Sequence, residues 1–339
     1  MPKRHPSCST TRTNRWSATW TVGGRRRRFA SGSRPWSNRR RPRRKPGKRE
    51  KGRGKAEEGR GRHVSKSIVL RSPREINMMR PAGLAVWKAH QLIRETVRPG
   101  VTTGEIDEVV RDFYQRIDAE PLFLNYPNST AGRPPFPGVT CTSVNEEVVH
   151  GIPGPRRLVE GDVVSIDTGC RLRGWCGDAA VTLPVGEISP DVQRLLDVTA
   201  EVLVLAIDLI PRKSRWSEVA GEMAAFVRQA GFSTVENFVG HGIGQKMHEP
   251  PQVPNYVGKK LRPKDDFRLD PGLVIAIEPM VNMGNKRVVA EPDFWTMSTA
   301  DGKPSAHFEH TVAIMEQGVR VLTAPPLDDI DEQIVKSLI

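Results

Sequence analysis

The sequence has few cysteines and no long apolar run. Only four cysteines occur among 339 residues, at positions 8, 141, 170 and 176, and no CxxC pair is present. This number is too small for a disulfide scaffold. There is no stretch of about 18 apolar residues of the kind that spans a membrane. The first residues also lack the apolar core of a secretory signal. These absences predict a cytoplasmic protein that does not enter a membrane.

Acidic residues are scarce in the first part of the chain. Residues 1–63 hold 22 Lys and Arg against three acidic residues, whereas residues 64–339 hold 30 basic and 36 acidic residues. The net charge of +13 therefore comes from the first segment. Its arginine runs repel one another, and its apolar residues are too sparse to offset chain entropy. We predict a disordered basic extension over residues 1–63 and one large folded domain over residues 64–339.

The basic extension has three interpretations. Its charge, together with Trp16, Trp20 and Trp36, favours contact with RNA or the ribosome. Its content of arginine and serine is also typical of an organelle transit peptide. In the third interpretation the segment is a translated upstream region, and the natural protein begins at Val64.

Helix signals occur in two pairs, each followed by strand signals. Ser72-Pro73-Arg74-Glu75 predicts a capped helix that runs to about residue 96, and a second capped helix begins at Thr102. The second pair is predicted at residues 190–210 and 217–230. Strands are predicted at residues 139–144, 161–169, 176–185, 235–239, 272–280, 287–290, 294–298 and 307–315, with a proline-rich loop over 121–139. This order predicts an α/β (α+β) fold with two related halves.

Two aspartates interrupt apolar strands in the first half. In residues 161–167, Asp167 shares a face with Ser165, and a turn over residues 171–174 should return Asp178 on the neighbouring strand. Aspartate is depleted in strands, so this pair requires an explanation. A metal ion supplies one, and acidic side chains that face water from an edge strand supply another.

Three further residues of ligand type follow in the second half. His241 lies in the glycine-rich segment Gly240-His241-Gly242-Ile243-Gly244, whereas Glu278 and Glu309 interrupt apolar strands, where an unpaired carboxylate would be costly. Four carboxylates and one imidazole are more than a single divalent ion usually needs. Two ions that share bridging carboxylates fit this set better.

Together these motifs resemble the type I methionine aminopeptidases. The resemblance covers residues 66–325. Besides the ligand-type residues above, it rests on the segment 145–153 (NEEVVHGIP), His248, Ile277-Glu278-Pro279-Met280 and Glu309-His310-Thr311. The short separation of Glu278 from Glu309 leaves no room for the helical insertion of type II enzymes. The same spacing, with no extra N-terminal domain, argues against prolidase and aminopeptidase P.

The resemblance implies a pita-bread fold, in which a curved antiparallel sheet is flanked by two helix pairs with pseudo-twofold halves. The implied activity is removal of the initiator methionine from nascent polypeptides whose second residue is small. Water activated by two divalent ions (Co, Mn, Fe or Zn) would carry out the hydrolysis. We expect a monomer that acts on polypeptide N-termini and not on DNA or membranes. The alternative is a binding module on ribosomes or RNA, as in relatives that have lost their ligands.

The resemblance also assigns roles to residues. Asp167 would hold the first ion, Asp178 and Glu309 would bridge both ions, and His241 and Glu278 would hold the second. Glu278 would also accept the proton of the water. His150 would lie beside the substrate amino terminus, and His248 would contact the scissile peptide. The methionine pocket would be formed by Phe123, Tyr126, Phe136, Cys141, Met247 and Trp295. Two departures affect this pocket: the insertion at residues 127–135, and Met247, where many relatives have phenylalanine.

Overall fold

The computed structural model describes residues 67–258 and 266–338. The predicted basic extension over residues 1–63 lies outside these residues, so its boundary with the folded domain stays a prediction. In the described part of the chain, no helix is long and apolar enough to cross a membrane.

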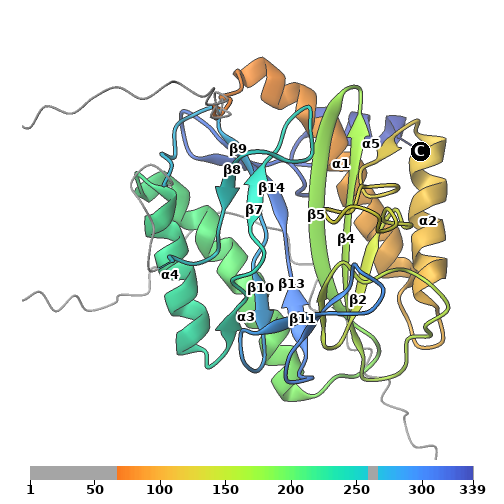
Figure 1. The fold of residues 1–339 in the computed structure, drawn as a ribbon. Helices are drawn as coiled ribbons and strands as arrows, with labels where there is room; N and C mark the ends of the chain where they lie inside the picture. Colours follow the sequence, from red (N-terminus) through yellow and green to blue (C-terminus); the bar gives the residue numbers. More distant parts are fainter. Residues whose placement is uncertain (1–66, 259–265, 339) are drawn as a thin grey trace, which may run out of the picture. The chain divides into compact units, whose positions relative to one another are not determined.

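Two pairs of long helices flank the strands (Figure 1). The first pair is α1 (Pro73–Thr96) and α2 (Thr103–Arg116), and the second is α3 (Pro190–Leu209) and α4 (Trp216–Gln229). A short 3₁₀ helix, η1 (Ile210–Arg212), follows α3, and α5 (Asp329–Ser337) lies near the end of the chain. The capping box predicted at Ser72 and Glu75 is confirmed, and Thr102 forms a second capping box with Glu105 at the start of α2.

The strands pair antiparallel throughout the described sheets. One sheet has the order β1 (Glu120–Pro121), β4 (Val163–Leu172), β2 (Cys141–Val144), and β5 (Trp175–Pro184) also pairs with β4. A five-stranded sheet has the order β15 (Val319–Val321), β14 (His310–Ile314), β9 (Val274–Ile277), β7 (Gly240–Gly242), β8 (Glu249–Val253). Two small sheets have the orders β13 (Ser305–His307), β10 (Met280–Asn282), β6 (Ser233–Thr234) and β11 (Val288–Ala290), β12 (Met297–Thr299), β3 (Glu147–Val149).

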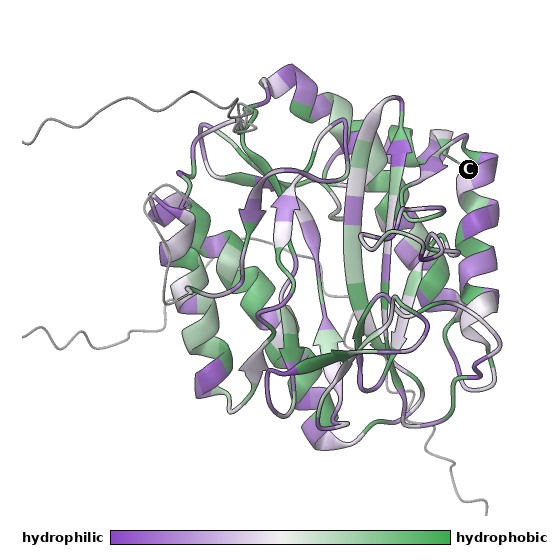
Figure 2. Cartoon of the chain, in the orientation of Figure 1, coloured by the Kyte–Doolittle hydropathy of each residue, from purple (hydrophilic) through white to green (hydrophobic). Residues whose placement is uncertain are grey.

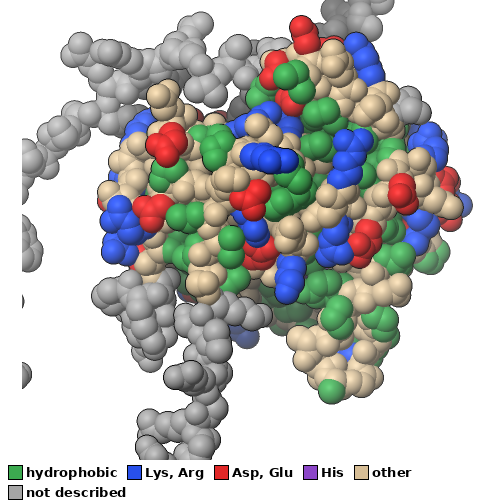
Figure 3. Space-filling model, turned by 90° about the horizontal axis from the view of Figure 1, so that it is seen from above, with side chains coloured by type: hydrophobic (Ala, Val, Ile, Leu, Met, Phe, Trp, Pro, Cys, Tyr) green, Lys and Arg blue, Asp and Glu red, His purple; other side chains and the backbone are tan. Residues whose placement is uncertain are grey.

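Each helix pair covers its own hydrophobic core. One core joins α1 and α2 to β4 and β5, and the other joins α3 and α4 to β9, β10 and β14. The inner faces of the helices are accordingly apolar (Figure 2). On the face shown in Figure 3, Lys and Arg side chains are interspersed with Asp and Glu. The mixed α/β fold with two helix pairs agrees with the sequence prediction.

Several boundaries in the second half differ from the prediction. Residues 235–239 do not form a strand, because the pairing with β10 ends at Thr234 and the chain then turns toward a cavity. The strand predicted over 272–280 is broken at Pro279, which has no N–H to donate to the ladder. The strand predicted over 307–315 is broken at Glu309, whose N–H donates to Ala180 O at 2.9 Å. Six short strands, the 3₁₀ helix and the last helix were not predicted: β1, β3, β6, β7, β8, β15, η1 and α5.

Candidate metal centre

The hairpin of β4 and β5 holds two aspartates in mid-strand. Asp167 pairs with Ala180 and Asp178 with Gly169, so the two acids lie diagonally on the same face of the hairpin. The turn between the strands is shorter than predicted and contains only residues 173–174, both with positive φ. Gly169 is required here, because a Cβ at this position would lie 2.7 Å from Asp178 Oδ1. The hairpin therefore brings the two carboxylates together, as the sequence predicted.

His241 reaches the same region from the short strand β7. A Cβ at Gly240 or Gly242 would lie 2.3 Å or 2.2 Å from a backbone oxygen of a neighbouring strand, so only glycine fits on either side of the histidine. The Nδ1 atom of His241 lies 3.0 Å from Gly242 O. Because a carbonyl can only accept, Nδ1 carries the hydrogen and the Nε2 lone pair is left for a ligand.

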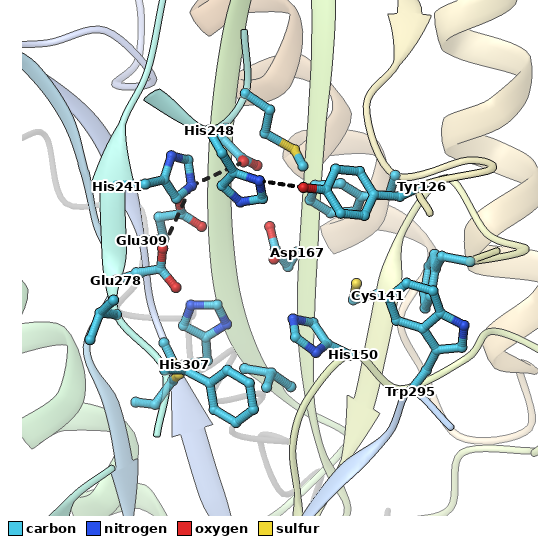
Figure 4. Close-up of a pocket in the computed structure, with 18 of the residues that line it drawn as sticks. Tyr126, Cys141, His150, Asp167, His241, His248, Glu278, Trp295, His307 and Glu309 are labelled. Atoms are coloured by element: carbon cyan, nitrogen blue, oxygen red, sulfur yellow. Dashed lines mark hydrogen bonds and ion pairs between the residues drawn. The ribbon is translucent and has the colours of Figure 1, made fainter. Parts of the chain in front are cut away.

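Glu278 and Glu309 lie at the two strand breaks. Asn255 Nδ2 donates to Glu278 O at 3.0 Å and holds the backbone between β9 and β10. At the other break, the hydrogen bond from Glu309 N–H to Ala180 O ties the second half of the fold to β5. Backbone groups that leave a strand ladder need such partners. The breaks place both carboxylates on the side of the site that faces Asp167 (Figure 4).

The five side chains form a buried, oxygen-rich cluster. His241 Nε2 lies 3.7 Å from Glu278 Oε1 and 4.0 Å from Asp178 Oδ2. One donor atom each from Asp178, His241 and Glu309 lies within 4.8 Å of the others, as in a site for a metal ion. Asp167 Oδ1, Asp178 Oδ1 and Glu309 Oε1 are buried and have no hydrogen-bond partner among the described residues. Carboxylate oxygens that lie this close together without hydrogen-bond partners are well suited to bind divalent cations.

The raised pKa values of these carboxyl groups also indicate that the cluster needs a positive charge. Burial raises the pKa of Asp178 to about 7. Burial, with the neighbouring Asp178, raises the pKa of Glu278 to about 8. Burial and the negative charges of Asp178 and Glu278 raise the pKa values of Asp167 and Glu309 far above the usual carboxyl range. Without a cation the cluster would therefore retain protons near neutral pH, and a cation would replace them.

His248 lies beside the cluster. Its ring is edge-on to the ring of His241, with 4.3 Å between the centroids, and its Nδ1 shares a hydrogen bond of 2.7 Å with the Tyr126 hydroxyl. Burial lowers the pKa of His248, so its neutral form is favoured. The tyrosine fixes the orientation of the ring, and Nε2 is then directed into the cavity.

His150 lies at the opposite side of the cavity in a strained conformation. Its φ is +61°, in the left-handed region that favours glycine. The ring is edge-on to Phe238 (5.4 Å) and Trp295 (6.5 Å). Burial lowers the pKa of His150 to about 4, so the ring is neutral and can donate or accept a hydrogen bond. Strain of this kind occurs where a side chain must be presented to a ligand.

One cavity of about 310 Å³ unites the predicted residues (Figure 4). All of the predicted metal ligands, both histidines and all of the predicted pocket residues line it: Asp167, Asp178, His241, Glu278, Glu309, His150, His248, Phe123, Tyr126, Phe136, Cys141, Met247 and Trp295. The carboxylates form one end. Buried apolar side chains such as Phe136 (2% exposed) and Cys141 (6%) form the other.

Further residues line the cavity that the sequence did not predict, among them Pro127, Ser129, Val149, Phe238, Met280 and His307. His307 is the most notable, since it is 2% exposed and its Nε2 has no partner among the described residues. Strand alternation could have found it, because His307 precedes Glu309 by two residues. No comparable signal identified Phe238, which reaches the cavity only because residues 235–239 leave the sheet.

Comparisons with known proteins agree with this geometry. Residues 77–316 match the Peptidase_M24 profile, described as metallopeptidase family M24. Methionine aminopeptidase 1 of Bacillus subtilis is 44% identical over 256 residues, which cover 76% of this chain and 99% of that protein. The crystal structure of a methionine aminopeptidase from Thermotoga maritima is similar, with a TM-score of 0.70, 40% identity, and coverage of 76% and 99%. The prolidase of Pyrococcus furiosus shares the fold (TM-score 0.57, 20% identity, coverage of 76% and 66%).

Proposed function

The chain belongs to metallopeptidase family M24 and to its methionine aminopeptidases, and from this premise we propose that it removes the N-terminal methionine from polypeptides whose second residue is small. The observation that carries the proposal is a single cavity with two different ends. One end holds the five ligand-type side chains, and the other is closed by buried apolar groups. An unbranched, apolar first side chain fits this arrangement.

We propose that two divalent ions occupy the carboxylate end. Asp167 would hold one ion, His241 and Glu278 the other, and Asp178 and Glu309 both. The carboxylate-rich set accepts Co, Mn, Fe or Zn, and supply in the cell decides which is used. When bound, such ions would supply a water of lowered pKa and would polarise the carbonyl that is attacked. The orphaned oxygens of the cluster support this assignment.

The remaining polar groups position the peptide and move protons. Glu278 would take the proton from the attacking water and pass it to the leaving amine, because its carboxylate lies within the ligand cluster, with Oε1 3.7 Å from His241 Nε2. His248, held by Tyr126, would donate a hydrogen bond to the scissile peptide. His150 would lie beside the substrate amino terminus. Both rings are neutral, so neither repels an ammonium group.

The pocket and its surroundings explain the selectivity. Tyr126, Phe136, Cys141, Met247 and Trp295 would enclose the methionine side chain. As the family membership implies, the site would tolerate little bulk at the second residue.

A peptide pair tests the proposed function. Mass spectrometry should detect methionine release from Met-Ala-Ser and little release from Met-Lys-Ser, because the second side chain of the latter is long. Release should require added Mn, Fe, Co or Zn and should stop after chelation. Equal cleavage of both peptides, or cleavage that persists in chelator, would contradict the proposal.

We further propose that the enzyme acts in the cytoplasm as a monomer and meets its substrates at the ribosome. The excess positive charge of residues 1–63, 22 Lys and Arg against three acids, favours contact with ribosomal RNA. Co-sedimentation with ribosomes should weaken as salt rises and should be lost without residues 1–63, whereas hydrolysis of short peptides should not change. Salt-independent binding, or slower hydrolysis of short peptides by the shortened chain, would contradict this role.

A further inference from the structure

Residues 127–135 form a loop that leaves and rejoins the wall of the cavity. The base of the loop is closed by two backbone hydrogen bonds, from Asn125 N–H to Phe136 O (2.8 Å) and from Phe136 N–H to Tyr126 O (2.9 Å). Tyr126 and Phe136, which flank the loop, both line the cavity. The loop contains three prolines, whose rings restrict the backbone. It is therefore anchored at the pocket itself and has limited freedom.

The loop also contacts a turn that lies about 160 residues later in the chain. Asn128 Nδ2 donates to Phe294 O at 3.1 Å, and the Arg133 guanidinium lies 4.6 Å from the centroid of the Phe294 ring. The Trp295 indole N–H donates to Pro134 O at 3.1 Å. A hydrogen bond, a cation–π contact and a second hydrogen bond thus join the loop to residues 294 and 295.

The turn is itself rigid. The Asp293 carboxylate accepts hydrogen bonds from the N–H groups of Trp295 (2.9 Å) and Thr296 (2.8 Å), and from the Thr296 hydroxyl. Phe294 has a φ of +70° and is 47% exposed, whereas Trp295 turns toward the cavity. The loop therefore contacts a fixed element and holds the one side chain of that element that lines the pocket.

Trp295 forms a wall of the apolar end. Its ring is edge-on to Phe136 at 5.3 Å and to His150 at 6.5 Å between centroids. The hydrogen bond from the indole N–H to Pro134 O is exposed, and it favours this orientation of the ring by joining it directly to the loop. The loop adds Pro127 and Ser129 to the cavity lining as well. The loop thus contributes atoms to the cavity wall and holds the Trp295 side chain in place.

We propose that the 127–135 loop sets the width of the first-residue pocket, so that the enzyme selects the unbranched methionine side chain over branched or aromatic ones. The inference rests on the proposed aminopeptidase activity and assigns its selectivity to this loop. Asn128, Arg133 and Pro134 act as positioning residues through Trp295, and they do not take part in hydrolysis.

The test compares the selectivity of loop variants. In the double variant Asn128→Ala/Arg133→Ala, both side-chain contacts to Phe294 are lost. The ratio of kcat/KM for Met-Ala-Ser to that for Leu-Ala-Ser should fall roughly tenfold, the scale for one contact of an apolar pocket. The kcat for Met-Ala-Ser should change little. Trp295→Phe, which keeps a ring but loses the N–H, should reduce the ratio similarly. Arg228→Ala removes an exposed charge of helix α4 and is the matched control.

Three results would overturn the inference. The selectivity ratio of the double variant could equal that of the wild type. The rates for both peptides could fall in parallel with the melting temperature, which would indicate a structural role only. Trp295→Phe could reduce selectivity while the double variant does not, which would place the determinant outside the loop.

A binding measurement separates failure of the inference from failure of the proposed function. Calorimetry with free L-methionine and L-leucine reports the selectivity of the pocket without turnover. The ratio of the affinity for methionine to that for leucine should be lower in the double variant than in the wild type. If the wild type binds methionine selectively but releases none from Met-Ala-Ser, the proposed function fails while the inference is still tested. An unchanged binding ratio in the double variant would contradict the inference whatever the activity.

Discussion

The two halves of the fold bring the proposed metal ligands to the same cluster in different ways. In the first half, Asp167 and Asp178 lie inside two continuous ten-residue strands. In the second half, Glu278 and Glu309 lie where strands break, and His241 lies in a strand of three residues. Each half nevertheless has its own helix pair and its own hydrophobic core.

The difference shows two ways to hold a metal ligand. In the hairpin, strand register alone determines where the carboxylates point, and Gly169 makes room for Asp178. At the breaks the ladder is lost, so single hydrogen bonds from Asn255 and to Ala180 O hold the backbone. The first half should therefore be sensitive to steric changes, and the second half to the loss of individual hydrogen bonds.

The largest effect should come from removing the charge of a proposed bridging carboxylate in either half. Asp178→Asn and Glu309→Gln should each lower kcat/KM for Met-Ala-Ser by more than the roughly 10–100-fold typical of outer-shell changes. Steady-state kinetics with metal-loaded protein measures this loss. Glu187→Gln, an exposed acid just beyond β5, is the control and should retain full activity. Near-normal turnover by one bridging variant only would show that the halves are not equivalent.

A steric change should damage the first half next. Gly169→Ala places a Cβ 2.7 Å from Asp178 Oδ1, so the carboxylate must move. We expect a loss of about 10–100-fold in metal affinity, measured by calorimetry with Mn²⁺, and about 1–3 kcal/mol of stability. Gly154→Ala is the matched control, because nothing lies within 4 Å of its added Cβ. Equal metal affinity of the two variants would contradict the role of register.

A lost hydrogen bond should affect the second half more gently. Asn255→Ala leaves Glu278 O without its donor, and we expect about a tenfold loss of metal affinity and about 1–3 kcal/mol of stability. Asn282→Ala removes another buried amide, which donates to Asn285 O, and should lower only stability. Denaturant unfolding and Mn²⁺ calorimetry separate the two outcomes. If Asn282→Ala weakens metal binding as strongly, the specific role of Asn255 is wrong.

The smallest effect concerns pH and involves both halves. The pKa values of Asp178 and Glu278 are raised to about 7 and about 8, so the metal-free folded state binds protons that the unfolded state has already lost. Their contribution to stability is complete below about pH 4 and disappears as pH rises to about 8. Buried histidines such as His241 and His307, whose pKa values are lowered to about 3, act in the opposite sense, but only up to the unfolded histidine pKa of about 6.5. The melting temperature of the metal-free protein should therefore fall between about pH 6.5 and 8, and added Mn²⁺ should raise it more at pH 8. A metal-free melting temperature that rises over this range would refute the assignment.

The same contrast explains what could be predicted from the sequence. The first half was predicted well, because capping boxes and strand alternation are local signals that placed Asp167 and Asp178 on one hairpin. The family resemblance was also confirmed. In the second half, continuous strands were predicted over 272–280 and 307–315, and both are broken. The break before β10 has a local cause in Pro279, whereas the break at Glu309 depends on the distant partner Ala180, which no local pattern reveals. Phe238 was missed for a different reason, because it reaches the cavity only where residues 235–239 leave the sheet.

The central claim is that both halves jointly build one centre for two metal ions. Native mass spectrometry of protein loaded with Mn²⁺ tests it most directly, with Asp167→Asn as the change in the first half and His241→Ala as the change in the second. The account predicts two ions on the wild-type chain and fewer than two on each variant. A wild-type chain that binds a single ion, or a His241→Ala chain that retains two, would contradict it.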